Sequence, residues 1–273
     1  MAKLQIGVLV TLKSDPEPEL RKVVDLGLRS CQVVNWNPDL WTDAMGDKLV
    51  GCAKKLDVTI SALWTGYPGR LVWNFLEGPS TIGLVPPETR AERVAALKKG
   101  ADFAAHCRLP AIATHVGFLA NDPNDSSYLA SVEAIRQVAQ HCADRGIGFW
   151  FETGQETPVV LLRTIELINT GNLGINLDPA NLILYGMANP VDALDVFGQY
   201  VRGVHAKDGL YPTDGKHLGK EVPLGEGKVN FPALIPKLKS CGFQGALTIE
   251  REISGPQQTA DIQTGIKLLE PLC

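Results

Sequence analysis

The sequence lacks the features that would place it on a nucleic acid, in a membrane or in a disulfide-bonded scaffold. Its 273 residues contain 26 Lys and Arg against 30 Asp and Glu, a formal net charge of −4, so no positive field gathers nucleic acid or an anionic membrane. The six cysteines lie far apart without a C-x-x-C pair, which favours reduced thiols over a disulfide framework. No apolar run is long enough for a signal segment or a membrane span, since the first, "IGVLV", passes directly into polar residues. We therefore expect a cytoplasmic protein without nucleic-acid or membrane partners.

What the sequence has is an alternation of two kinds of segment. Short and almost continuous apolar runs, typical of parallel strands covered on both faces, occur at 6–10, 31–34, 59–64, 111–116, 147–151, 173–178, 201–206 and 246–250. Between them lie longer segments with helical spacing, such as 88–107 and 126–146; we expect the latter to begin at a serine cap. Eight such pairs, with no G-x-G-x-x-G after the first strand, predict a single-domain (β/α)8 TIM barrel over residues 1–273.

Two loops of this predicted barrel are long, at 65–87 and 209–230. Each follows the carboxyl end of a strand, which is the side where such barrels place their active sites. In the second loop Gly225 and Gly227 flank Glu226, which indicates a tight turn, with an anion-binding nest as the alternative.

Four consecutive predicted strands end in a residue that can ligate a metal. Glu152, Asp178, His205 and Glu250 close the runs "FWFE", "GINLD", "GVH" and "LTIE". Because strand ends converge in a closed barrel, we expect three carboxylates and one imidazole around a common point, where the carboxylates would repel one another without a cation. The sequence therefore predicts one divalent metal ion. Oxygen-rich ligation with a single histidine favours Mn²⁺, with Mg²⁺, Co²⁺ or Zn²⁺ as alternatives.

The segments "FET", "LDPAN", "VHAKD", "PLGEGKVNF" and "TIERE", in this order, resemble the xylose-isomerase-like TIM-barrel superfamily. This superfamily contains sugar and sugar-phosphate isomerases and epimerases, inosose dehydratases and AP endonucleases of the endonuclease IV type. The resemblance implies the same four metal ligands and a small carbohydrate substrate. In its isomerase and epimerase branches it also implies that Glu152 and Glu250 move protons on opposite faces of the sugar, and family members often form homo-oligomers.

The chemistry of an isomerase or epimerase fits these residues. Such a reaction removes a proton next to a carbonyl, and a metal on the carbonyl oxygen stabilises the negative charge that develops. One carboxylate takes the proton, and in an epimerase a second carboxylate returns one on the other face. No phosphate-binding motif in the sequence separates free from phosphorylated sugars.

Departures from the family pattern keep other reactions open. Asn181 stands where ketose 3-epimerases have a histidine after the strand-six aspartate, and their arginine after the strand-seven histidine has no counterpart. An inosose-type dehydratase and a non-catalytic sugar-binding barrel are therefore alternatives. An endonuclease IV-like repair enzyme is a further one, although that family uses three metals and more histidines. The acidic net charge also argues against duplex binding.

Several other residues are candidates for substrate binding. Asn181 can hydrogen-bond a hydroxyl without carrying charge. His115 is either a pocket residue or a buried structural histidine, and Trp64 either stacks on a sugar or plugs the barrel. Glu156 either reaches substrate hydroxyls or lies in the first turn of the next helix. Lys207 and Asp208 follow the metal histidine closely and are predicted substrate contacts.

Overall fold

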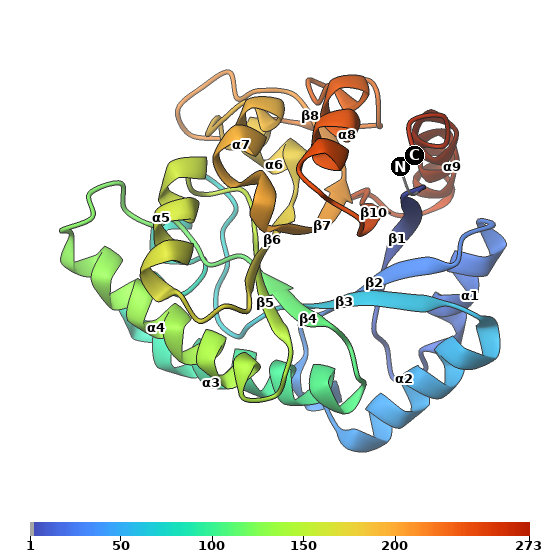
Figure 1. Ribbon diagram of the computed structural model, residues 1–273, viewed down its shortest axis with the longest axis horizontal. Helices are drawn as coiled ribbons and strands as arrows, with labels where there is room; N and C mark the ends of the chain where they lie inside the picture. The colour runs from blue at the N-terminus through green and yellow to red at the C-terminus, as the bar shows by residue number, and fades with distance from the viewer. Residues whose placement is uncertain (1–2) are drawn as a thin grey trace.

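The protein folds as a closed barrel of parallel strands surrounded by helices (Figure 1). The structure is a computed structural model that describes residues 3–273, and within these residues eight strands close the barrel in the order β1-β10-β7-β6-β5-β4-β3-β2. They are β1 (Gln5–Thr11), β2 (Ser30–Asn35), β3 (Thr59–Thr65), β4 (Ala111–Thr114), β5 (Gly148–Glu152), β6 (Leu173–Leu177), β7 (Val201–Ala206) and β10 (Ala246–Ile249). The predicted (β/α)8 TIM barrel is confirmed.

The helices connect successive strands on the outside of the barrel, which Figure 1 shows as an incomplete ring around the strands. They are α1 (Glu17–Asp25), α2 (Asp43–Leu56), α3 (Pro87–His106), α4 (Ser126–Ala143), α5 (Pro158–Ile168), α6 (Pro179–Leu184), α7 (Pro190–Phe197), α8 (Phe231–Ser240) and α9 (Pro256–Leu269). Short 3₁₀ turns are η1 (Pro38–Leu40), η2 (Gly78–Ser80) and η3 (Gly198–Tyr200).

Local sequence fixes where these helices begin. Thr157 accepts a hydrogen bond from the Val160 N–H at the start of α5, and Pro158 follows at the first helical position, where its missing N–H costs no hydrogen bond. The N-cap of α4 is Asp125, whose side chain accepts a hydrogen bond from the Ser127 N–H, and Ser126 is the first helical residue. The predicted serine cap is therefore wrong. A carboxylate there also favours the positive end of the helix dipole.

The strands are buried on both faces, as their almost continuous apolar sequences predict. Every residue of β4, β6 and β10 is buried. One side of each strand packs inside the barrel and the other against the helices, so polar residues within the strands stand out as exceptions.

The first long loop, which joins β3 to α3, is held down by Arg93 of α3. This arginine is fully buried, and its guanidinium donates hydrogen bonds to the carbonyls of Pro68, Arg70 and Gly83. Five donors in a rigid fork can bind several carbonyls at once, which a lysine cannot do with the same geometry. The loop is therefore a fixed wall over the barrel.

The second long loop, which joins β7 to α8, contains regular structure that the sequence pattern did not indicate. Strand β8 (Asp208–Gly209) pairs antiparallel with β9 (Glu221–Val222). The two long loops also meet, because the Phe75 N–H donates to the Lys216 carbonyl at 3.2 Å. Both loops thus contribute to one side of the barrel mouth.

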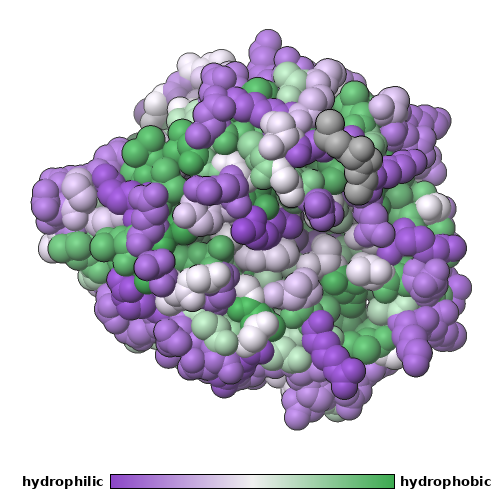
Figure 2. All heavy atoms as spheres, viewed as in Figure 1, coloured by the Kyte–Doolittle hydropathy of each residue, from purple (hydrophilic) through white to green (hydrophobic). Residues whose placement is uncertain are grey.

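The surface and the cysteines follow the composition. Figure 2 shows hydrophilic side chains along much of the outline of the molecule in this view, with hydrophobic patches between them. All six cysteines are free thiols, as predicted. Among the helices of residues 3–273, none combines the length and apolar character required to cross a bilayer.

Candidate metal centre

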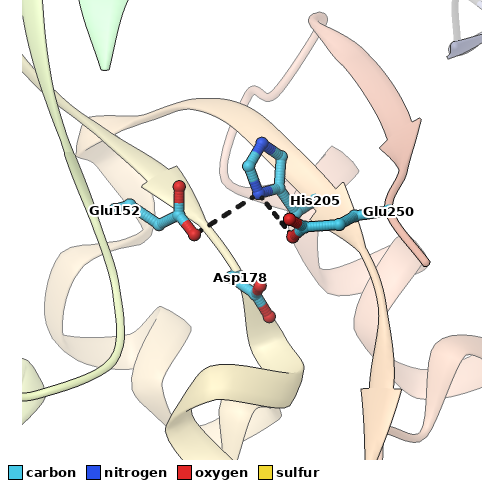
Figure 3. A group of neighbouring side chains, drawn as sticks. All are labelled: Glu152, Asp178, His205 and Glu250. Atoms are coloured by element: carbon cyan, nitrogen blue, oxygen red, sulfur yellow. Dashed lines mark ion pairs between the residues drawn. The ribbon is translucent and has the colours of Figure 1, made fainter. Parts of the chain in front are cut away.

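The four predicted ligands converge at the carboxyl ends of neighbouring strands. Glu152 ends β5, Asp178 follows β6, His205 lies in β7, and Glu250 follows β10. Each offers one ligand atom, and these atoms all lie within 4.8 Å of one another. Figure 3 shows Glu152 and Glu250 on opposite sides of the His205 ring, with Asp178 below it. The group has the composition and the compactness of a divalent metal site.

The two side-chain oxygens of Asp178 have different roles, one in capping a helix and one in the cluster. Oδ1 accepts a hydrogen bond from the Asn181 N–H and thereby caps α6. The main chain of Asp178 is fixed to the end of β5, because its N–H donates to Thr153 Oγ1 and its carbonyl accepts from the same hydroxyl. Oδ2 is buried and has no hydrogen-bond partner within residues 3–273, so it is available as a ligand.

His205 is oriented by a chain of buried amides. Its Nε2 lies 2.6 Å from Gln32 Oε1, and the Gln32 side-chain amide donates to Asn176 Oδ1 at 3.1 Å. Because the second bond fixes the orientation of the Gln32 amide, Nε2 of His205 is the donor, and Nδ1 carries the lone pair when the ring is neutral. Gly203 leaves room for Asn176, since a Cβ there would lie 2.4 Å from Asn176 Oδ1.

Glu152 is fixed by three side chains of the cavity wall. The Trp64 indole N–H donates to Oε2, and the Asn181 amide donates to Oε1 at 3.3 Å. His115 Nε2 also lies 3.3 Å from Oε1. Burial opposes ionisation, but the charge of the neighbouring His205 keeps the pKa of Glu152 below its ordinary value. The side chain is therefore an oriented carboxylate that can accept a proton.

Lys207 is the cation that faces the cluster. Its ammonium lies 3.3 Å from Asp178 Oδ2, 3.5 Å from Glu250 Oε2 and 2.6 Å from Glu252 Oε1. Burial opposes ionisation of Glu250, and the charges of Lys207 and His205 lower its pKa below the ordinary value. The lysine thus offsets part of the repulsion among the carboxylates.

The buried groups fit a bound cation. Burial raises the pKa of Asp178 to about 7, although the Lys207 charge opposes this. His205 Nδ1 also has no hydrogen-bond partner in the described chain, while it lies 3.1 Å from Glu250 Oε2 and 3.5 Å from Glu152 Oε1. A divalent ion between these atoms would pair the orphaned oxygen and nitrogen and keep all three carboxylates ionised.

A cavity of about 410 Å³ opens above the cluster. Of the residues predicted to bind substrate, His115, Trp64 and Asn181 line it. Burial lowers the pKa of His115, so its ring is neutral and can accept or donate a hydrogen bond. Its Nδ1 has no partner among the described residues. Lys207 is 2% exposed and supports the ligands from behind the cavity wall.

Two predicted substrate contacts lie elsewhere. Asp208 is buried, and its carboxylate accepts hydrogen bonds from four backbone N–H groups of its own loop, so it anchors the loop and does not line the cavity. Glu156 is also outside the cavity lining. It does not lie in the first turn of α5 either, because Thr157 takes the cap position. Glu156 is 2% exposed, and both oxygens of its carboxylate are buried without a hydrogen-bond partner in residues 3–273.

Residues absent from the sequence prediction complete the site. Gln32 and Asn176 orient His205, and Glu252 pairs with Lys207. The aromatic rings of Trp36 and Trp73 line the cavity mouth. Glu252 lies two residues after Glu250 and lines the same cavity, so its spacing from Glu250 was the signal in the sequence. A single amide within the apolar run of β2 was the signal for Gln32.

The second long loop carries one further histidine, His217. It is exposed and pairs with Asp214, three residues before it, with Nδ1 at 3.1 Å from Oδ2. Neither residue belongs to the cluster of four ligands.

The family model described as "Xylose isomerase-like TIM barrel" matches residues 20–272. A xylose isomerase domain protein from Planctomyces limnophilus superposes with a TM-score of 0.93 at 36% identity, over 99% of this chain and 98% of that one. A D-psicose 3-epimerase solved with D-fructose present has a TM-score of 0.72 at 14% identity, over 98% and 99% of the two chains. An uncharacterized protein of Methanocaldococcus jannaschii is 35% identical over 99 residues, which is 35% of this chain and 31% of that protein. The match thus spans about a third of that relative.

Replacing Gln32 by Leu is expected to weaken Mn²⁺ binding by about 10- to 100-fold, because Nε2 of His205 loses the acceptor that fixes its tautomer. The measurement is calorimetric titration of metal-free protein. Gln32→Glu is the matched control, since it keeps an acceptor next to His205 and should retain more of the affinity. Equal affinities for the wild type and Gln32→Leu would contradict the role of this amide.

Glu156 is expected to make stability fall as the pH rises. Burial raises its pKa to about 8 from an ordinary value of 4.5, so the folded protein holds this proton more tightly than the unfolded chain does. The resulting stabilisation is complete below pH 4.5 and is lost as the pH rises through about 8. The side chain of Glu156→Gln cannot ionise. The free energy of unfolding of this variant, relative to that of the wild type, should therefore rise by on the order of 3 kcal/mol between pH 5 and pH 9.

Urea unfolding at several pH values measures this difference. Glu166→Gln, an exposed glutamate on α5, serves as the control and should show no such trend. A gain for Glu156→Gln that stays constant with pH would mean that Glu156 is ionised in the folded protein.

Proposed function

The chain belongs to the xylose isomerase-like TIM-barrel family, and we propose that it is a divalent-metal-dependent isomerase or epimerase of a sugar. The observation that carries the proposal is the pair of glutamates on opposite sides of His205 (Figure 3). The pKa of each lies below the ordinary value, so both are carboxylates that can accept a proton. Glu152, Asp178, His205 and Glu250 would hold the metal.

The metal would supply electrophilic assistance, because a divalent cation next to a carbonyl oxygen stabilises the negative charge that develops when a neighbouring proton leaves. Manganese fits this set best, since three carboxylates and one imidazole form an oxygen-rich site. All other steps are assigned to side chains of the chain itself.

Glu152 and Glu250 are the proposed proton carriers. Trp64 and Asn181 fix the Glu152 carboxylate from the cavity wall, and Lys207 and His205 fix Glu250. A base must be held within hydrogen-bond reach of the proton it removes, and this positioning is what those contacts supply. In an epimerase one glutamate removes the proton from one face, and the other returns a proton to the opposite face.

His115, Asn181 and Trp64 are proposed to bind the substrate. His115 presents a nitrogen without a partner among the described residues, and the Asn181 amide lies between Glu152 and Lys207. The rings of Trp36 and Trp73 would cover the apolar face of a sugar and exclude water from the reacting carbon.

Solvent exchange tests the two-base assignment. Wild-type protein loaded with Mn²⁺ is incubated with each member of a pair of C3-epimeric ketoses in D₂O, and the deuterium at the reacting carbon is followed by NMR. Glu152→Gln and Glu250→Gln should each slow interconversion by at least about 100-fold. Each variant should still exchange the proton of the one epimer whose face the remaining glutamate serves.

Metal content is determined in the same samples, because each glutamate also offers an oxygen to the metal. Full interconversion by both metal-loaded variants would contradict the assignment. A dehydratase also begins with proton removal but then loses a hydroxyl, so a dehydrated product in the wild-type reaction would identify the lyase alternative.

A further inference from the structure

The charged groups around the cavity select for the charge of the substrate. Glu152, Glu250 and Glu252 line the cavity together with aromatic and aliphatic side chains such as Trp36 and Leu218. No lysine or arginine of residues 3–273 is part of this lining. Phosphate groups are usually bound by such cations or by free backbone N–H groups, and among the described residues this wall presents three carboxylates and no such cationic side chain.

The nearest ammonium is already neutralised. An ammonium has three N–H donors, and those of Lys207 reach Asn181 Oδ1 at 3.2 Å, Glu250 Oε2 at 3.5 Å and Glu252 Oε1 at 2.6 Å. Its charge also lies 3.3 Å from Asp178 Oδ2, so no donor remains for a ligand. Even with a divalent ion bound, a net charge of one negative unit remains, because the positive charges of the metal and Lys207 do not fully balance four carboxylates. These are Glu152, Asp178, Glu250 and Glu252.

The backbone site where a phosphate could bind is filled from within the chain. TIM barrels often hold phosphate with the loops that follow the last two strands, and consecutive backbone N–H groups there form an anion nest. In this chain the N–H groups of Gly225 and Gly227 donate to Asp208 Oδ2, and those of Gly209 and Val229 donate to Oδ1. All four distances lie between 2.9 and 3.1 Å.

This nest is shaped for the aspartate. A Cβ at Gly227 would lie 2.0 Å from Asp208 Oδ1, so the loop closes around the carboxylate only with glycine at this position. The Asp208 carboxylate accepts all four N–H bonds and leaves none of these donors for a ligand.

We infer that the substrate of this site is uncharged, a keto-polyol without a phosphate or carboxylate group. The inference rests on the proposed function, since it concerns the ligand of the same cavity. It adds that the part of the substrate away from the metal packs on the aromatic wall of Trp36 and Trp73, which are 40% and 41% exposed at the mouth. A phosphorylated sugar would place a dianion near Glu252.

The test compares free and phosphorylated forms of the same compounds. Dihydroxyacetone, D-ribulose and D-fructose are titrated into the Mg²⁺-loaded protein beside dihydroxyacetone phosphate, D-ribulose 5-phosphate and D-fructose 6-phosphate, and tryptophan fluorescence reports binding. Whichever pair binds, the free member is expected to bind at least about tenfold more tightly, because a like charge at close range is strongly unfavourable. A phosphorylated member that binds as tightly as its free form, or more tightly, would overturn the inference and leave the proposed function standing.

Charge variants test whether the Glu252 carboxylate is what disfavours the phosphorylated sugars. Glu252→Gln frees the Lys207 ammonium and should improve binding of the phosphorylated members, relative to their free forms, by about tenfold. Glu226→Gln removes the same charge from an exposed position in the loop and should change neither. If no member of any pair binds or exchanges its α-proton, both the inference and the proposed function are wrong.

Discussion

The repulsion among three carboxylates, two of them buried and the third half-buried, is the constraint on which the rest of this structure depends. Glu152, Asp178 and Glu250 are brought within a few ångströms by the closure of the barrel, and burial removes the water that would screen them. The Lys207 ammonium offsets part of this repulsion from one side. The remaining negative charge faces the orphaned Nδ1 of His205, and a divalent ion is the group that would satisfy both.

The surrounding residues keep this charged cluster in one geometry. The amides of Gln32 and Asn176 orient the imidazole, and Trp64 orients a glutamate. Asp208 does not contact the cluster, but its carboxylate accepts backbone hydrogen bonds that order the loop after β7. The chain thus uses its backbone donors to order the loop, while the cavity above the cluster stays aromatic and acidic. This division explains how a metal-binding barrel can favour an uncharged ligand.

Much of this could be predicted from the sequence, because the barrel and the cluster follow from patterns along the chain. Alternating apolar runs and helices specify the fold, and strand closure then brings Glu152, Asp178, His205 and Glu250 together. Lys207 and Asp208 show what the sequence pattern could not predict. They are adjacent, yet one faces the ligands and the other faces its own loop, because successive residues of an extended chain point in opposite directions. The burial of the Glu156 side chain also could not be predicted, because it depends on tertiary packing and not on a local sequence pattern.

The most direct test of the metal centre is the metal content of purified protein, measured by elemental analysis for the wild type beside Asp178→Asn. The asparagine keeps an oxygen that can cap α6, so the variant should fold, and Asp214→Asn controls for the loss of an exposed carboxylate. We predict about one equivalent of a divalent metal in the wild type and in the control, and its loss in Asp178→Asn. A wild-type protein that takes up no metal after reloading, or an Asp178→Asn variant that retains it fully, would contradict the account.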